Sequence, residues 1–182
     1  MFPLTLRETK GSPLTHQEMD NNLKHVMFPP FLHIQDQKPS GTHGGSFTAG
    51  AWRTRDLNTV LTNTITGASL AANQITLPAG KYYVEADVPS EVQTQNSPLS
   101  SSRLSSNGVP LLFGTNYRIN ANVQGSGANT ASRIRGIIKL LNLVDDIIIQ
   151  HRTSRNHTYG TAADFQTEVY SDIRIWRVGE AD

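Results

Sequence analysis

Residues 75–86 read Ile-Thr-Leu-Pro-Ala-Gly-Lys-Tyr-Tyr-Val-Glu-Ala. A short apolar run enters the Pro-Ala-Gly turn and an aromatic and β-branched run leaves it, which is typical of two strands joined by a turn. We expect Gly80 to take the positive φ of such a turn, because glycine has no Cβ to clash. Side chains alternate across a strand, so Tyr82, Val84 and Ala86 should then point into one core.

Similar runs recur through most of the chain after residue 30. The predicted strands are Leu32–Gln37, Ala51–Leu57, Gln74–Leu77, Tyr82–Val88, Val109–Phe113, Tyr117–Val123, Arg133–Leu140, Leu143–His151 and Glu168–Val178. Turn residues separate them, and the Ser- and Gln-rich segment Pro89–Asn107 is expected to form a long polar loop. Many short strands at this spacing indicate an all-β sandwich or barrel rather than a parallel α/β sheet.

Composition supports this fold class and excludes several functions. Apolar residues make up 37% of the 182 residues and charged residues 17%, and Ser, Thr, Asn, Gln and Gly fill the deficit, which favours turns and strand edges. The formal net charge of +1 lacks the basic excess of proteins that bind nucleic acid through its phosphates. The absence of cysteine rules out disulfides and thiolate metal sites.

One helix is predicted, close to the N-terminus. Thr15 can cap the helix and Glu18, three residues later, can cap back, which makes a capping box. Leu14 before the cap and Met19 inside the helix fit a hydrophobic staple. The helix should therefore begin just after Thr15.

The predicted helix carries a single narrow apolar stripe, formed by Met19, Leu23 and Val26. A helix of roughly 11 residues is marginal alone in water, so we expect this stripe to dock on a partner. The pair Pro29-Pro30 ends the helix and divides the chain into an N-terminal segment (residues 1–30) and a head domain (residues 31–182).

No membrane insertion is expected. The first ten residues have no apolar region behind a basic start, so they do not form a secretory signal. The longest apolar stretch, residues 137–149, is interrupted by polar and charged side chains and is too short to cross a bilayer.

The last predicted strand is bulky on both faces. Alternation places Val169, Ile173 and Ile175 on one face of the strand. The opposite face carries Tyr170, Arg174 and Trp176. One face should lie in the core, and we expect Tyr170, Arg174 and Trp176 to lie in a subunit interface. The alternative is that Trp176 lies flat beneath a loop.

Side chains suited to catalysis or metal binding are not grouped in this sequence. Asp145 and Asp146 are adjacent, so in a strand they point to opposite faces and cannot act as one acid–base pair. None of the six histidines has a known zinc spacing, although three copies of His33 or His151 could meet on a symmetry axis. We predict no catalytic residue, no metal ligand and no cofactor.

One predicted loop has the side chains of a recognition surface. Its candidate receptor contacts are Arg152, Arg155, His157 and Tyr159. Arginine pairs with phosphate or carboxylate, and tyrosine stacks on a sugar ring, so the loop would suit lipopolysaccharide or another surface glycan. The alternative is an ordinary solvated loop.

Two stretches resemble known families. Residues 10–23, Lys-Gly-Ser-Pro-Leu-Thr-His-Gln-Glu-Met-Asp-Asn-Asn-Leu, resemble a segment near the start of many phage tail-fibre and tail-associated proteins, with Leu23 where that family often has Phe. The stretch 75–86 resembles a central strand of the tumour-necrosis-factor/C1q-like jelly roll, and residues 51–58 and 169–176 occupy fitting places.

These resemblances imply a non-enzymatic virion protein, made in the host cytoplasm, whose jelly-roll head assembles as a homotrimer. They imply that the N-terminal segment binds other tail or baseplate proteins, through Leu14, Thr15, Glu18, Met19 and Leu23. The head of such a tail fibre or receptor-binding component would contact a glycan or protein of the bacterial surface. The alternatives are a capsid decoration protein or head fibre, a tail adaptor and, less favoured, a glycan depolymerase.

Overall fold

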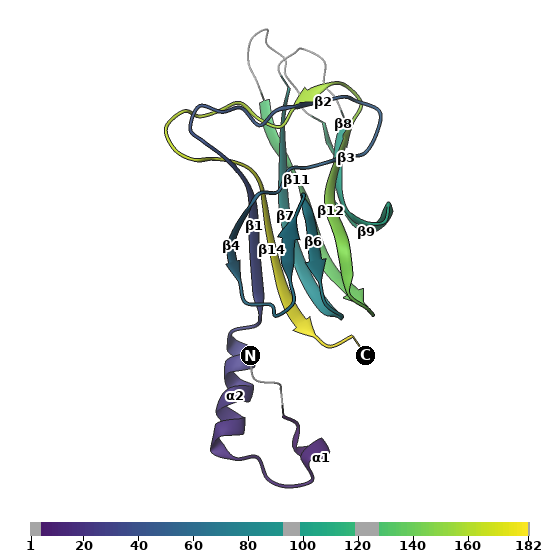
Figure 1. Cartoon of the computed structure of the whole chain (residues 1–182). Helices are drawn as coiled ribbons and strands as arrows, with labels where there is room; N and C mark the ends of the chain where they lie inside the picture. The colour runs from purple at the N-terminus through teal and green to yellow at the C-terminus, as the bar shows by residue number, and fades with distance from the viewer. Residues whose placement is uncertain (1–4, 93–98, 119–127, 182) are drawn as a thin grey trace.

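The computed structural model describes residues 5–92, 99–118 and 128–181. Two antiparallel sheets pack face to face, and two helices, α1 (Arg7–Lys10) and α2 (His16–Met27), lie outside the sandwich at one end (Figure 1). The predicted helix is thus present as α2. We call the end of the sandwich opposite α2 the far end.

Sheet A has the strand order β4 (Thr59–Asn63), β1 (Phe31–Lys38), β14 (Glu168–Gly179), β7 (Gly80–Val92) and β11 (Ala128–Leu140), with β13 (His157–Thr158) and β2 (Ser46–Phe47) at the far end. Sheet B has the order β5 (Ser69–Ala71), β6 (Gln74–Leu77), β12 (Val144–Thr153), β8 (Leu99–Ser106) and β9 (Val109–Phe113). Two short strands add to sheet B: β3 (Arg53–Thr54) pairs with β12, and β10 (Tyr117–Arg118) pairs with β8.

The connections between the two sheets are those of a jelly roll. After β5 and β6 in sheet B the chain returns to sheet A for β7, enters sheet B for β8 and β9, and crosses for β11, β12 and β14 in turn. The first and last long strands, β1 and β14, pair at the centre of sheet A. The expected all-β jelly-roll sandwich is confirmed.

The core forms where the alternating side chains of both sheets meet. Tyr82, Val84 and Ala86 are buried there, as predicted. Gly80 differs from the prediction, because it is the first residue of β7 and does not have a positive φ. The backbone at Gly80 is closely packed instead, since a Cβ would lie 3.2 Å from the Tyr82 ring.

The prediction of a loop over Pro89–Asn107 is wrong for its second half, which is the central strand β8. The inward positions of β8 include Ser100 and Ser102, so the strand has little of the apolar alternation that predicts strands. The Ser102 hydroxyl donates to the Ser132 hydroxyl at 2.6 Å, which satisfies the polar group of Ser102 inside the sandwich. The short strands β4 and β5 also lie outside the predicted set.

Two other predicted strands are shorter than expected. Within Ala51–Leu57 only β3 is a strand, and Arg55 and Leu57 are buried beyond it. Within Tyr117–Val123 the structure describes only β10, and residues 119–123 lie outside the described part of the chain.

A β-bulge changes which side chains of β14 face inward. Ser171 pairs with Asp36 and Val169 with Gln37, so Tyr170 is the extra residue between them. The bulge buries both Tyr170 and Ser171 and leaves Val169 43% exposed, which reverses the prediction for Val169 and Tyr170. Ile173 and Ile175 point inward as predicted, with Arg174 and Trp176 on the other face.

We expect Leu32→Ala to lower the free energy of unfolding by about 2–5 kcal/mol, because Leu32 is fully buried between the sheets. Leu141→Ala is the matched control, since Leu141 is 67% exposed and its loss should change stability by no more than about 0.5 kcal/mol. Urea unfolding at one protein concentration measures both variants. Equal losses in the two variants would contradict the assigned core.

Candidate functional site

The N-terminal segment is built around the predicted capping box. The Thr15 backbone N–H donates to the Glu18 carboxylate at 2.7 Å, and the Glu18 N–H donates to the Thr15 hydroxyl at 3.2 Å. Lys10 also donates to Glu18, and this bond, followed by the Thr15 backbone bond, lowers the pKa of Glu18 to about 2. The residue pattern thus positions the start of α2 as expected.

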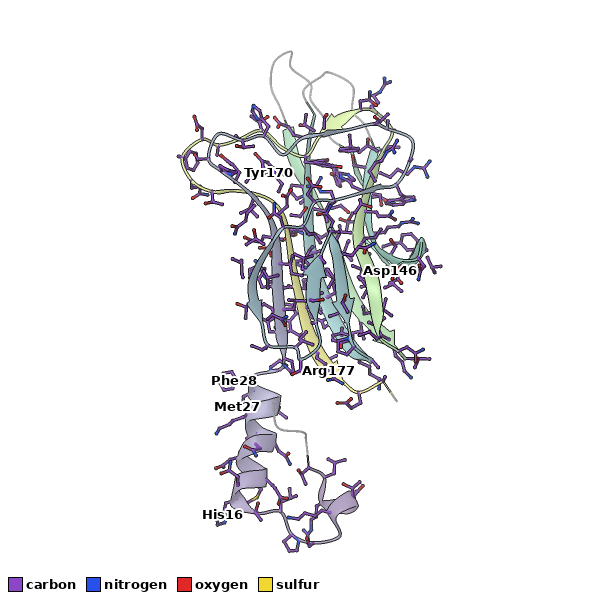
Figure 2. All side chains as sticks on the ribbon, viewed as in Figure 1. His16, Met27, Phe28, Asp146, Tyr170 and Arg177 are labelled. Carbon is purple, nitrogen blue, oxygen red and sulfur yellow. The ribbon has the colours of Figure 1, made fainter. Side chains whose placement is uncertain are left out.

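The apolar stripe of α2 has no partner within the described residues. Met19 is 42% exposed, Leu23 61% and Val26 73%, and Met27 and Phe28 continue the exposed surface to the sandwich (Figure 2). Exposed apolar side chains gathered on one short helix favour a binding role for it.

The outer face of sheet A carries a band of apolar side chains near α2. The strand register places four of them side by side, which we call the apolar row: Phe31, Trp176, Tyr83 and Ile137. The ring centroids of Phe31 and Trp176 lie 4.9 Å apart and those of Tyr83 and Trp176 lie 5.8 Å apart. Ile137, at the end of the row, is 64% exposed.

Charged side chains cover the next part of this face. Asp172 binds His33 at 2.9 Å and Arg174 at 3.0 Å, and Asp87 binds Arg133 at 3.2 Å. The predicted interface residues Arg174 and Trp176 therefore share one surface of sheet A. That surface combines apolar contact area with charges that are already partly paired.

The third predicted interface residue, Tyr170, does not lie on this surface. It is 4% exposed at the far end, where its hydroxyl donates to the Thr42 carbonyl at 2.8 Å (Figure 2). Its ring packs against the backbones of Gly44 and Gly160, where a Cβ would come within 2.8 Å of ring atoms. The prediction for Tyr170 is wrong, because the bulge in β14 turns the ring inward beneath the chain's own loops.

Arg55, which the sequence did not single out, organises the interior of the far end. Its guanidinium lies 3.8 Å from the centre of the Tyr159 ring and donates to the Tyr170 carbonyl and the Ser171 hydroxyl. Complete burial lowers the pKa of Arg55 to about 10. Tyr159 also stacks on Phe47, with centroids 4.8 Å apart.

This internal cluster corrects two further expectations. Tyr159 is 8% exposed, so it cannot stack on a ligand as predicted. His151 is fully buried beside Phe47 and does not reach the surface of either sheet, so it cannot meet its copies on a symmetry axis. Of the other receptor candidates, Arg152 and Arg155 are exposed, and the side chain of His157 lies outside the described part.

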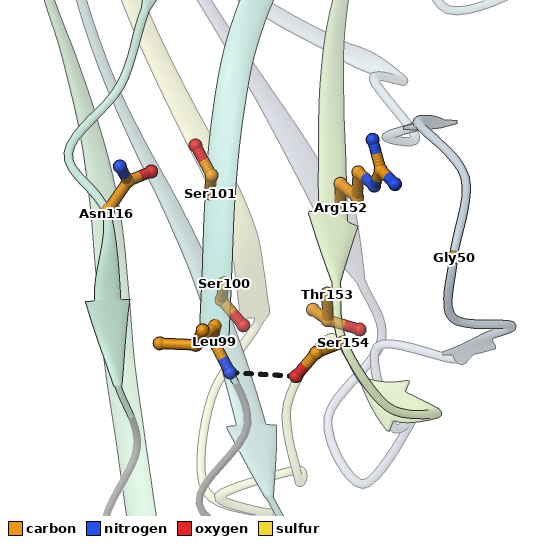
Figure 3. A pocket seen from close by; sticks show the side chains of 8 residues that line it. All are labelled: Gly50, Leu99, Ser100, Ser101, Asn116, Arg152, Thr153 and Ser154. Atoms are coloured by element: carbon orange, nitrogen blue, oxygen red, sulfur yellow. Dashed lines mark hydrogen bonds between the residues drawn. The ribbon is translucent and has the colours of Figure 1, made fainter.

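A pocket of about 390 Å³ opens on the surface of sheet B at the far end (Figure 3). Its lining includes Leu99, Ser101, Asn116, Arg152, Thr153 and Ser154. The Leu99 N–H donates to the Ser154 hydroxyl at 3.0 Å, which ties β8 to the end of β12. The pocket thus brings the predicted Arg152 together with hydroxyl and amide groups that the sequence did not connect to it.

The described residues contain no group of three or more side chains placed to hold a metal ion. Among the same residues, no helix has the length and apolar character needed to cross a bilayer. Asp146 accepts hydrogen bonds from the Ser106 hydroxyl and the Asn107 N–H, and therefore stabilises the turn after β8.

The comparisons with known proteins concern the fold. No family model and no curated protein matches the sequence. Among solved structures, 169 chains match. One of them, the Eiger TNF of S. frugiperda, aligns with a TM-score of 0.49 and 10% identity over 85% of this chain and 96% of that chain.

Glu168 ties two loops of the far end together. Its carboxylate accepts the backbone N–H groups of Asp164 at 2.8 Å, Ala163 at 3.0 Å and Gly41 at 3.3 Å. These bonds, those from Ala163 and Asp164 first, lower the pKa of Glu168. The ionised carboxylate therefore stabilises the loops that cover Tyr170.

The pKa of Glu168 is lowered in the folded state, so its ionised carboxylate stabilises the fold at any pH above the ordinary carboxyl pKa. This stabilisation is lost as the pH falls through the folded-state pKa. Glu168→Gln should therefore lower the unfolding free energy at pH 7, and its difference from the wild type should shrink below pH ~4. Unfolding curves measured from pH 2 to 7 test this. Glu8→Gln, at an exposed position in α1, is the control, and a pH-independent difference for Glu168→Gln would contradict the assignment.

Proposed function

We propose that this chain is a non-enzymatic structural protein of a phage virion, a tail-fibre or receptor-binding component that contacts the bacterial surface. The observation that carries the proposal is the exposed apolar stripe of α2, which stands outside the sandwich at the end opposite the pocket (Figure 1). An attachment element at one end and a binding surface at the other suit a protein that links a particle to a cell. The resemblance of residues 10–23 to tail-associated proteins supports the same role.

In this proposal the N-terminal segment joins the particle. The capping box of Thr15 and Glu18 fixes the start of α2, and Met19 and Leu23 present the apolar surface that binds a tail or baseplate protein. Leu14, which is half-buried before the cap, supports the same segment. The particle is then the site where the chain acts.

The head acts as a homotrimer that closes around the outer face of sheet A. The apolar row and Arg174 form the subunit contact, since three copies around an axis cover a surface that one copy leaves in water. The same symmetry brings three α2 helices together. Three copies also raise avidity for a repeated surface ligand without any new contact.

The absence of catalysis in this proposal is supported by how the carboxylates are used. Asp87 and Asp172 lie opposite each other on β7 and β14, yet Arg133 binds the first and Arg174 the second. Both carboxylates are therefore already engaged in ion pairs with arginines. A glycan depolymerase would need a freer pair.

We expect the wild-type protein to be a trimer at micromolar concentration, and Trp176→Glu to make it monomeric, because a buried unpaired carboxylate is costly. Multi-angle light scattering measures the mass, and far-UV circular dichroism checks that the variant is folded. Phe165→Glu is the matched control, since Phe165 is 79% exposed in a loop and the variant should stay trimeric. A monomeric wild-type protein would overturn the trimer.

Attachment is tested on particles. Leu23→Asp should abolish incorporation of the protein into virions, whereas Gln17→Asp, an exposed polar position of the same helix, should be incorporated normally. Immunogold labelling of purified particles measures both. Label on the tail supports the proposal, label on the capsid favours a decoration protein, and absence of wild-type protein from particles overturns a virion role.

A further inference from the structure

Two arginines lie close together on the outer face of sheet B at the far end. In the register of β12 and β8, Gln150 is opposite Arg103, and Arg152 is opposite Ser101 two residues further on. Alternation places all four side chains on the same face. We call Arg103 and Arg152 the arginine pair.

The Arg103 side chain is held in place before any ligand arrives. Its guanidinium lies 4.4 Å from the centre of the half-buried Trp52 ring, and its Nε donates to the Gln150 side-chain oxygen at 2.7 Å. Gln150 is itself held by the Ser105 hydroxyl at 3.0 Å. These contacts leave the terminal nitrogens of Arg103 without a hydrogen bond inside the described part of the chain.

Arg152 is exposed at the edge of the pocket and makes no hydrogen bond or ion pair with any described residue (Figure 3). Burial and then the nearby charge of Arg152 lower the pKa of Arg103, which reflects two cations at short range. Residues 93–98 and 119–127, which the structure does not describe, contain no aspartate or glutamate that could neutralise them. The arginine pair therefore lacks a carboxylate in the described structure, whereas Arg133, Arg135, Arg174 and Arg177 each have one.

The surroundings of the arginine pair are neutral hydrogen-bonding groups. Ser101, Asn116 and Ser154 line the adjoining pocket together with Leu99. The volume of about 390 Å³ lies within the roughly 300–1,000 Å³ of small-molecule sites. Hydroxyl and amide groups match the hydroxyls of a sugar, and guanidinium forks match a carboxylate or phosphate.

We propose that the arginine pair and the adjoining pocket bind an anionic saccharide, with its carboxylate or phosphate on Arg103 and Arg152 and its hydroxyls in the pocket. The anionic saccharide is the class of ligand for the end of the proposed attachment protein that contacts the host. Its origin on a bacterial surface rests on the proposed function. A protein partner or nucleic acid fits less well, since the surface is a small hollow rather than a broad apolar or basic area.

Calorimetric titration of the full chain tests the proposal with three probes of equal length: a galacturonate tetrasaccharide, a phosphate-monoester tetrasaccharide and a neutral galactose tetrasaccharide. We expect at least tenfold tighter binding of one or both charged probes, weakened by added salt. The better charged probe identifies carboxylate or phosphate as the recognised group. Equal binding of charged and neutral probes, or no binding of any probe, would overturn the inference.

Variants locate the site. Arg152→Gln should lower the affinity for the charged probe by at least tenfold without changing the unfolding midpoint, because Arg152 has no internal contact to lose. Arg103→Gln should also lower the affinity for the charged probe by at least tenfold, and it should loosen the packing of the Trp52 ring. Arg7→Gln is the control, because it removes the same charge from α1 and should leave binding unchanged. Wild-type affinity in Arg152→Gln would refute the site. Particle labelling is independent of this titration, so either proposal can fail alone.

Discussion

Burial of aliphatic side chains between the two sheets is the constraint on which the rest of this structure depends. Ile34 and Ile175 in sheet A face Leu104 and Ile149 in sheet B, and all four are fully buried. Because side chains alternate along a strand, fixing these inward positions also fixes what stands outside. That register therefore places Arg174 and Trp176 on one outer surface, and Arg103 and Arg152 on the other.

The interior changes character along the length of the sandwich. Near α2 it is aliphatic, whereas the far end contains buried polar side chains: Arg55 donates to Ser171, and Ser102 donates to Ser132. Buried polar groups stabilise a structure only when each finds a partner, so this end depends on specific geometry rather than on apolar area. The loops there are held by Glu168 and Arg55, and the pocket opens beside them.

The two outer surfaces suit different tasks. The apolar row on sheet A offers rings and an aliphatic side chain close to the exposed stripe of α2, which favours contact with copies of the same chain. The arginine pair on sheet B is small, polar and cationic, which favours a soluble charged group. A jelly roll keeps these surfaces apart because its two sheets face in opposite directions.

The sequence by itself determined the elements whose signals are local. The capping box of α2 needs only Thr15 and Glu18, and the inward positions of Tyr82 and Val84 follow from alternation along one strand. The sequence also singled out Arg152, which was expected in a polar loop; it is exposed, but it lies in strand β12.

Only the tertiary structure decided the positions that depend on contacts between distant segments. The bulge that buries Tyr170 arises from pairing between β14 and β1, more than a hundred residues apart in the chain. Tyr159 is buried because Phe47 and Arg55 pack on it, and Ser102 of β8 is satisfied inside the sandwich because Ser132 of β11 accepts its hydrogen bond. Periodicity cannot show such pairings, since a polar side chain is stable inside only when a distant residue satisfies it.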